Sequence, residues 1–330
     1  MPARIEQNEP NPGAQRLSLD ALRRWESLGY GMFIHFGMST FDGDEFSRGD
    51  KPSTTYAPDR LDVDQWIQVA RDAGMKYAVL TAKHVAGHCL WPTKHTDYHV
   101  GTSGNRTDVV EAFVQSCEKH HVRPGLYYCS FDNHNTFGSL TWTHQASLPA
   151  FTTGRYREFQ FAQIEELLTQ YGRIAEVWID IPGVLGAEGR QQQYDQIARL
   201  QPDAVIMMNS GFGDGTKLKC DYAWPTDLMA IERNLPSSNR GYKPWHRVEV
   251  RKGEAKDYYV PGEVCDPIGQ EWFAINDDRP RSDAELLGMR LICRERKVNL
   301  LLNVPPSRHG VIEKHYVDAL TRLARNVEGF

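Results

Sequence analysis

The stretch Tyr77-Ala-Val-Leu-Thr-Ala-Lys-His84 decides the fold, because it is an apolar run that closes on two polar residues. Residues 61–74, directly before it, carry apolar side chains at helical spacing and end on Gly74, a usual C-terminal stop for a helix. Short apolar runs joined by helices are typical of buried parallel strands. The segment is therefore interpreted as one helix–strand unit of a parallel sheet.

The same unit recurs along the chain. Strands are predicted at six apolar runs: 30–37, 77–84, 123–128, 176–180, 204–209 and 298–304. Helices are predicted at seven segments: 19–27, 61–74, 108–121, 155–171, 191–201, 282–297 and 316–326. The less regular segment 211–262 is expected to supply long loops and two shorter strands. This alternation implies right-handed crossovers in a parallel sheet.

A barrel fits this pattern better than an open dinucleotide-binding sheet. No G-x-G-x-x-G follows the first predicted strand, and no G-x-x-x-x-G-K-S/T occurs in the chain. A barrel of this kind reaches about 250 residues or more as one domain, so the length does not require a split. We predict an extended N-terminal arm at residues 1–18 and a single (β/α)8 barrel at residues 19–330.

Composition narrows the class of protein. The 330 residues are 40% hydrophobic and 25% charged, with a net charge of −5 and no basic run, so neither disorder nor a nucleic-acid partner is expected. No stretch approaches the roughly 18 apolar residues of a membrane span, and no signal-peptide pattern opens the chain. None of the six cysteines is at C-x-x-C spacing. Free thiols in a reducing, cytoplasmic compartment are the expectation.

Polar residues gather where the predicted strands end. His35, His84 and Asp180 close three of the runs, and Lys83 and the pair Tyr127-Tyr128 stand at the same kind of position. In a (β/α)8 barrel the carboxyl ends of all strands open onto one face, which carries the chemistry. Asp180 follows the apolar Val177-Trp-Ile179, where an unpaired carboxylate is costly, so it either acts chemically or caps the next turn.

The histidines do not form a recognisable metal motif. His84 and His88 have i, i+4 spacing, but Gly87 lies between them and the glutamate of H-E-x-x-H is absent. No metal or organic cofactor is expected. Four tryptophans could stack on a flat ligand face or simply fill the core: Trp91, Trp178, Trp224 and Trp272.

Three acids lie close together near the end of the irregular region. Glu263, Asp266 and Glu271 share the segment 260–273 with aromatic residues, and surface loops of this composition are usually solvated. No one of the three is distinguished by its sequence surroundings.

Six motifs in order resemble glycoside hydrolase family twenty-nine, the retaining α-L-fucosidases. They are Met32-Phe-Ile-His-Phe-Gly37, Tyr56-Ala-Pro-Asp-Arg-Leu61, Leu80-Thr-Ala-Lys-His84 with Cys89-Leu-Trp-Pro92, Gly125-Leu-Tyr-Tyr128, Val177-Trp-Ile-Asp180 and Asn299-Leu-Leu-Leu-Asn-Val-Pro305. The resemblance covers residues 20–326, and therefore the catalytic barrel without the β-sandwich that the family usually adds. It implies a retaining exo-glycosidase acting on fucosylated oligosaccharides or glycoconjugates.

The resemblance also implies residue roles. Asp180 matches the nucleophile, and Glu263 resembles the acid/base of the branch that prefers α-1,3 and α-1,4 linkages. Seven residues are expected to bind the sugar, the first five by matching family positions and the last two as aromatic neighbours: His35, Glu45, His84, Tyr128, Trp178, Trp272 and Phe273. The two carboxylates would act by double displacement.

Two departures from the family pattern concern the sugar. Val85 stands where a second sugar-binding histidine is common, and Phe46 follows Glu45 where tryptophan is common. These departures leave open a related hydrolase for another deoxy or galacto-configured sugar. A non-catalytic sugar-binding barrel is the other alternative.

Overall fold

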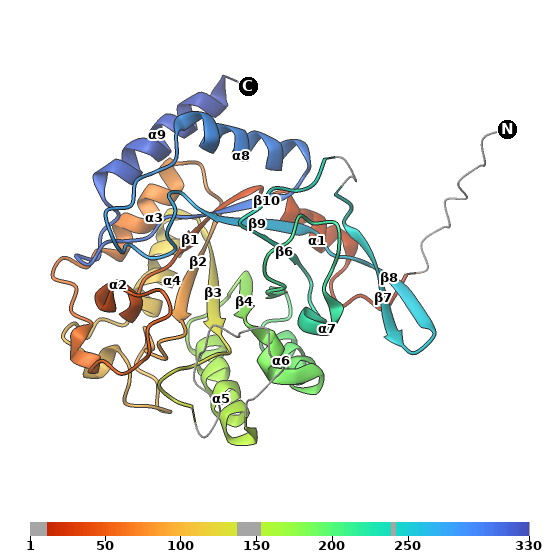
Figure 1. The fold of residues 1–330 in the computed structure, drawn as a ribbon, viewed down its shortest axis with the longest axis horizontal. Coiled ribbons are helices and arrows are strands. Elements are labelled where there is room, and N and C mark those ends of the chain that lie inside the picture. The colour runs from red at the N-terminus through yellow and green to blue at the C-terminus, as the bar shows by residue number, and fades with distance from the viewer. Residues whose placement is uncertain (1–11, 137–152, 239–241, 330) are drawn as a thin grey trace.

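The structure is a computed structural model that describes residues 12–136, 153–238 and 242–329. Eight parallel strands form one sheet in the order β5-β4-β3-β2-β1-β10-β9-β6, curled into a nearly closed barrel (Figure 1). The barrel strands are β1 (Tyr30–Ile34), β2 (Tyr77–Lys83), β3 (Arg123–Cys129), β4 (Glu176–Asp180), β5 (Val205–Met208), β6 (Met229–Glu232), β9 (Gly262–Pro267) and β10 (Asn299–Asn303). The predicted (β/α)8 class is confirmed.

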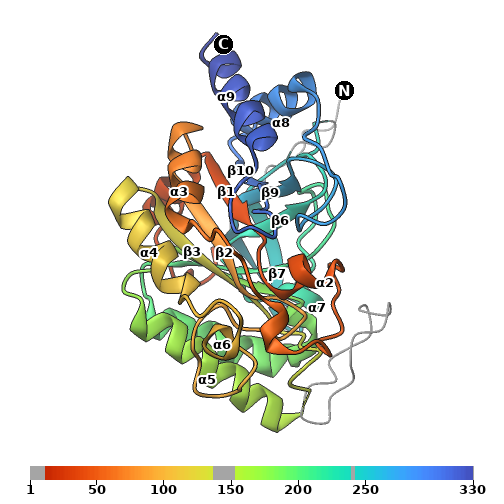
Figure 2. The same ribbon diagram turned by 90° about the vertical axis from the view of Figure 1, so that its left-hand side faces the viewer.

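Helices cover the outside of the barrel, as Figures 1 and 2 show. The α-helices are α1 (Leu19–Glu26), α2 (Met38–Asp42), α3 (Val63–Asp72), α4 (Val109–His120), α5 (Gly154–Gln170), α6 (Gly186–Leu200), α7 (Cys220–Ala223), α8 (Asp283–Glu295) and α9 (Lys314–Glu328). All seven predicted helices are present, and their bounds agree within two residues except at the start of α6. Side chains at the predicted starts accept the first backbone N–H groups, as Asp62 and Asp108 do for α3 and α4.

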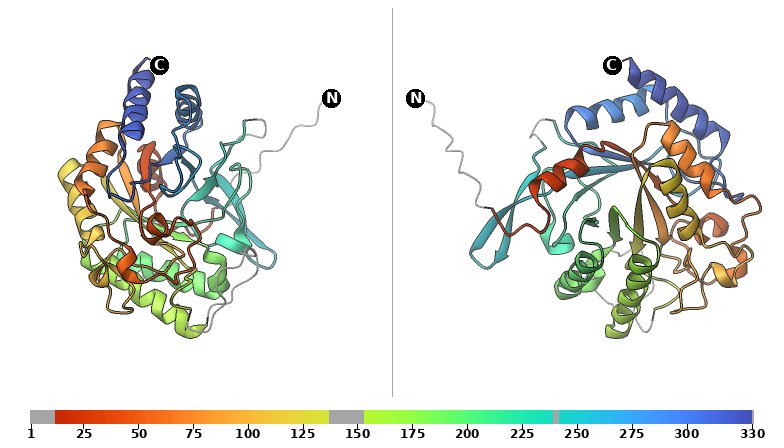
Figure 3. Two further views of the ribbon diagram at one scale, coloured as in Figure 1. Left: turned by 60° about the vertical axis from the view of Figure 1, so that its left-hand side comes forward. Right: turned by 180° about the vertical axis from the view of Figure 1, so that it is seen from behind.

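The irregular segment differs from the prediction. It contains three strands rather than two, because β6 is followed by an antiparallel hairpin of β7 (Trp245–Arg251) and β8 (Glu254–Tyr259). The hairpin extends from the barrel beside α1 (Figures 1 and 3), and the Tyr259 hydroxyl donates to Glu26 at 2.9 Å. Between β6 and β9 the described chain therefore has a hairpin where the other units have a helix.

Side chains alternate between the inside of the barrel and the layer under the helices. On β4, Trp178 packs in the interior cluster, whereas Val177 and Ile179 pack in the outer cluster with the helices. Leu22 and Trp25 of α1 belong to the interior cluster, so α1 closes the end of the barrel where the strands begin. The carboxyl ends of the strands are left to form the site.

The seam between β5 and β6 is closed mainly by residues that precede β6. The Asp227 N–H donates to the Ile206 carbonyl at 2.8 Å, and the Asp227 carboxylate accepts the Ile206 N–H at 2.9 Å. The same carboxylate accepts from Tyr194 of α6 and pairs with Arg16 of the N-terminal segment. One buried side chain thus joins the two ends of the sheet, a covering helix and the segment before α1.

All six cysteines carry free thiols. Within the described ranges, no helix combines the length and the apolar character needed to cross a bilayer.

Replacing Asp227 with alanine should open the seam. The variant leaves the Arg16 guanidinium, the Tyr194 hydroxyl and the Ile206 N–H without their shared acceptor, which should cost about 2–4 kcal/mol of unfolding free energy. Equilibrium urea unfolding measures the loss. Asp203→Ala is the matched control, because Asp203 forms only an exposed ion pair with Arg173 and should have little effect. An Asp227→Ala protein as stable as the control would contradict this account of the seam.

Candidate active site

A cavity of about 670 Å³ opens at the carboxyl ends of the barrel strands. Its walls come from the ends of β1, β2, β3, β4, β5, β6 and β9 and from the loops that follow them. A concave site of this volume suits a small ligand such as a sugar ring. It lies on the face that the sequence pattern predicted.

Asp180 faces this cavity from the end of β4. Its Oδ2 accepts the Tyr127 hydroxyl at 2.6 Å and its Oδ1 accepts the Asn209 side-chain amide at 2.7 Å. Burial raises the pKa of Asp180, and the hydrogen bonds from Tyr127 and Asn209 oppose that rise because they favour the carboxylate. The two donors also hold the carboxylate in one orientation.

Glu232 is the second carboxyl of the site, and the sequence analysis missed it. It ends β6 and lines the cavity, and its Oε2 accepts the same Asn209 Nδ2 at 3.1 Å. The nearest oxygens of Asp180 and Glu232 therefore lie at most about 6 Å apart. Burial, with the charge of Asp180 next in size, raises the pKa of Glu232 to about 7. The run Leu228-Met-Ala-Ile-Glu232 carried the signal, because it closes on an acid as the run to Asp180 does.

Glu45 is a third carboxyl on the cavity wall, as expected. Burial raises its pKa to about 7, the nearby Arg233 guanidinium lowers it, and the charges of Glu271, Glu232 and Asp180 add to the rise. Arg233 itself lies over the Trp272 ring at 5.1 Å and donates to a backbone carbonyl. A guanidinium thus balances part of the negative charge.

Glu263 does not lie in the cavity, and its expected placement opposite Asp180 is wrong. It is the second residue of β9 and is fully buried beside Glu176, the first residue of β4. Tyr77 and Trp178 donate to its carboxyl at 2.7 and 2.9 Å, and burial raises the pKa of both Glu176 and Glu263. At about 3.3 Å per strand residue, Glu176 and Asp180 stand about 13 Å apart along β4. Glu263 therefore lies at the opposite end of the barrel interior from the cavity.

Neither alternative acid of that segment lines the cavity. Asp266 is the penultimate residue of β9 and pairs with Arg281 at 2.8 Å. Glu271 contributes to the site through its charge on Glu45. The segment predicted as a loop is a buried barrel strand from Gly262 to Pro267.

His35 and His84 both line the cavity, as predicted. Their ring centroids are 5.7 Å apart, and His35 Nδ1 lies 2.8 Å from Asn303 Oδ1. Burial lowers the pKa of His35 to about 3 and lowers that of His84 well below its usual value. Both rings are therefore neutral near pH 7, and each offers one donor and one acceptor.

Tyr127, and not Tyr128, faces the cavity. Alternation along β3 turns Tyr128 outward, where its hydroxyl donates to Gln163 of α5 at 2.8 Å. Tyr127 turns inward and holds Asp180. The assignment of Tyr128 as a sugar-binding residue is therefore corrected: the neighbouring tyrosine occupies the site.

Some of the predicted aromatic residues line the cavity, and others pack outside it. Trp178 and Trp272 line the cavity, whereas Phe273 packs behind it against the rings of His35 and His84 at 5.3 and 4.9 Å. Trp91 and Trp224 contribute no surface to it: the Trp91 indole donates to Glu166, and Trp224 packs on Tyr258. Val85 lines the cavity at the position of the missing histidine.

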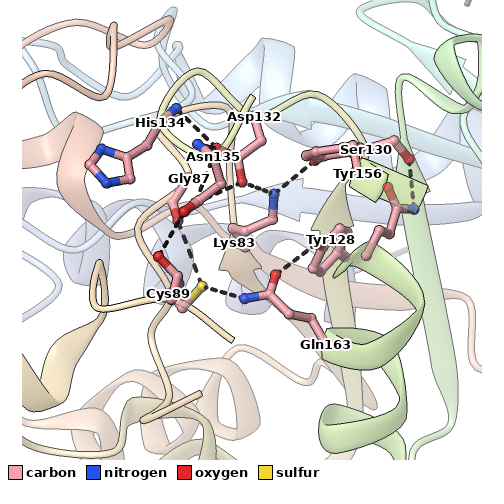
Figure 4. Close-up of polar contacts among 12 residues, drawn as sticks. Lys83, Gly87, Cys89, Tyr128, Ser130, Asp132, His134, Asn135, Tyr156 and Gln163 are labelled. Carbon is pink, nitrogen blue, oxygen red and sulfur yellow. Dashed lines mark hydrogen bonds and ion pairs between the residues drawn. The ribbon is translucent and has the colours of Figure 1, made fainter. Parts of the chain in front are cut away.

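Lys83 points away from the cavity because β2 has an irregularity. Strict alternation from Tyr77 would turn Lys83 inward, but the register with β3 shifts between Thr81 and Lys83, and His84 faces the cavity instead. Such bulges re-aim side chains near sites. The Lys83 ammonium, fully buried, pairs with Asp132 at 2.8 Å and lies 4.4 Å from the Tyr128 ring centroid (Figure 4).

Asp132 organises the loop after β3. Its Oδ1 accepts the backbone N–H groups of His134 and Asn135, as Figure 4 shows. From the same loop, Asn133 donates to the Ser47 carbonyl at 2.9 Å. The ion pair therefore connects the end of β2 to the loop that carries Glu45.

Among the residues the structure describes, no group of three or more His, Cys, Asp or Glu side chains could hold a metal ion. The polar groups on the cavity wall are carboxyl, imidazole, phenol, indole, amide, hydroxyl, thiol, ammonium and guanidinium groups.

The class of protein is a (β/α)8 barrel with its site at the carboxyl face, and in this site one amide bridges two carboxyls. Residues 43–328 match the family model described as Alpha-L-fucosidase, and the chain belongs to this family. The family inferred from the six motifs is confirmed.

Individual relatives agree with the family. The chain is 31% identical over 329 residues to Alpha-L-fucosidase 1 of Arabidopsis thaliana, covering 96% of this chain and 60% of that protein. It is 29% identical over 317 residues to Putative alpha-L-fucosidase 1 of Oryza sativa subsp. japonica, covering 90% and 56%. A putative alpha-L-fucosidase structure from Bacteroides thetaiotaomicron superposes with a TM-score of 0.74 at 28% identity, covering 97% and 70%. The chain spans 60% or less of the length of these two curated relatives.

Breaking the Lys83–Asp132 pair should destabilise the wall of the site. Asp132→Asn leaves a buried ammonium with the Tyr156 hydroxyl at 3.4 Å and the Tyr128 ring, so we expect a loss of about 3–5 kcal/mol. The double variant Lys83→Met/Asp132→Asn removes that charge and should be more stable than Asp132→Asn alone. Urea unfolding of both single variants and the double variant measures the coupling. Additive losses would contradict a direct interaction between the two charges.

Proposed function

We propose that the protein hydrolyses α-L-fucosides of oligosaccharides or glycoconjugates with retention of configuration. Asp180 attacks the anomeric carbon and forms a glycosyl-enzyme. Glu232 protonates the departing oxygen and then activates the water that releases the sugar. The family membership supports the sugar, and the arrangement of the cavity supports the residue roles.

The observation that carries the mechanism is the bridge through Asn209. One amide nitrogen donates to both carboxyls, which keeps their nearest oxygens within about 6 Å while both face the cavity. Retaining enzymes have carboxyl groups about 5–5.5 Å apart, whereas inverting enzymes need about 6.5–9.5 Å to admit a water molecule. The spacing favours double displacement.

The surroundings of the two carboxyls favour different protonation states. Asp180 receives two hydrogen bonds, from Tyr127 and Asn209, and both favour its ionised form. Glu232 receives one, from Asn209, and its pKa is raised to about 7. Activity should therefore rise with pH as Asp180 ionises and fall as pH passes through about 7, because the first step needs a protonated Glu232. This division fits an ionised nucleophile and a protonated acid.

The remaining wall suits a deoxy sugar. Neutral His35 and His84 can each donate to or accept from a hydroxyl, and Trp178 and Trp272 offer apolar faces. Sugar rings present hydroxyls at their edge and C–H bonds on their faces, which matches this mixture. Glu45 adds a further acceptor or donor.

Val85 favours a second candidate, a related sugar of galacto configuration or another deoxy sugar. It supplies a methyl surface where a histidine would bind a hydroxyl. A panel of p-nitrophenyl glycosides separates these sugars. The preference for α-1,3 and α-1,4 linkages stays a prediction from the sequence resemblance, and a panel of fucosylated disaccharides tests it.

The nucleophile is tested by Asp180→Gly. Loss of covalent catalysis should lower kcat by at least about 10³-fold. Azide should restore turnover by entering the space of the lost carboxylate, and the product should be the β-fucosyl azide. Near-normal activity in Asp180→Gly would remove Asp180 from this role, whereas a wild-type protein without turnover would leave a sugar-binding barrel as the alternative.

The acid/base is tested by the dependence on the leaving group. Glu232→Ala should impair fucosyl disaccharides by at least about 10²-fold but fucosides of acidic phenols far less, because good leaving groups need no protonation. The fall in rate above pH 7 should also flatten. Glu263→Gln is the matched control, since it alters a buried carboxyl at the other end of the barrel and should show no such dependence. Should Glu45→Ala show the effect in place of Glu232→Ala, the role belongs to Glu45.

A further inference from the structure

Two large apolar side chains are exposed in the described part of the chain, and both line the cavity. Phe46 is 36% exposed and Phe212 is 65% exposed. Folded proteins normally bury such rings, and exposed apolar surface at a concave site is typical of ligand contacts. Phe212 is the more exposed of the two, and none of the roles proposed above uses it.

The backbone around Phe212 is held firmly although its ring is exposed. Phe212 lies in the loop after β5, and its backbone forms a parallel bridge with Glu232. Lys219 Nζ donates to its carbonyl at 2.7 Å, and the preceding Gly211 N–H donates to Asn209 Oδ1 at 2.7 Å. The loop is therefore tied to the amide that bridges the two carboxyls, so the backbone that carries the ring is fixed relative to the site.

Phe212 lies on the same side of the cavity as Glu232, the proposed general acid. A general acid must lie within hydrogen-bond reach of the oxygen that it protonates. The group beyond that oxygen, which departs in the first step, must then extend along the Glu232 side. His35, His84 and Tyr127 lie at the ends of β1, β2 and β3, where the proposed function places the fucose ring.

We propose that Phe212 is the platform of a leaving-group subsite that takes a hexopyranose unit, whose C–H face stacks on the phenyl ring. This inference rests on the proposed function and adds the class of group to which the fucose is attached. A pyranose face is flat and apolar and matches a single exposed ring. Lys219, which also lines the cavity, offers a donor for the hydroxyls at the edge of that unit.

The test compares a substrate that has a sugar leaving group with one that has none. Disaccharides of fucose linked α-1,2, α-1,3, α-1,4 or α-1,6 to a hexose fill the subsite, whereas α-L-fucosyl fluoride leaves it empty. Phe212→Ala should lower kcat/KM for the preferred disaccharide at least about tenfold more than for the fluoride. Phe212→Tyr keeps the ring and should restore the ratio, whereas Phe212→Leu keeps bulk without an aromatic face and should not.

The possible outcomes separate this inference from the proposed function. Equal losses of kcat/KM on both substrates in Phe212→Ala, or no loss on either, would overturn the leaving-group subsite. Hydrolysis of the fluoride by the wild-type protein would still support the proposed function. A wild-type protein that hydrolyses the fluoride but no disaccharide would also overturn the subsite. A wild-type protein inert toward every fucoside would overturn the proposed function itself.

Discussion

Alternation of side chains along the strands of a closed barrel is the constraint on which the site depends. Each strand sends every second side chain inward, and the inward residue at the carboxyl end faces the cavity. On β3 this rule places Tyr127 against Asp180 and sends Tyr128 to α5. On β2 the register shift after Thr81 changes the outcome, so that His84 faces inward and Lys83 becomes structural.

Two carboxyls that both face the barrel interior differ in their depth along the strands. Glu263 and Glu232 both face the interior from neighbouring strands. Glu263 lies near the start of its strand and is buried beneath Trp178, so its raised pKa reflects burial without access for a substrate. Glu232 ends its strand and combines a raised pKa with exposure to the cavity. A perturbed pKa therefore indicates function here only when the group also reaches the cavity.

The polar network outside the strands stabilises the cavity indirectly. Lys83 and Asp132 form an ion pair that is closed to solvent. The loop that Asp132 organises also holds the segment around Ser47, because Asn133 donates to the Ser47 carbonyl. Gly87 has a φ of +81° and lies so close to Asp132 that a Cβ would overlap the carboxylate. This contact explains the glycine at position 87, between His84 and His88.

The sequence by itself determined the barrel, its helices, the family and the position of Asp180, because hydrophobic periodicity and strand-end residues are local signals. It also pointed to His35, His84, Glu45, Trp178 and Trp272, which all line the cavity. Only the tertiary structure decided between Tyr127 and Tyr128, between Glu232 and Glu263, and between the two orientations open to Lys83. The physical reason is that strand register, a bulge and depth in the barrel arise from pairing between strands, and no single segment of the chain encodes them. The bridge through Asn209 is of the same kind, since it joins residues from three strands.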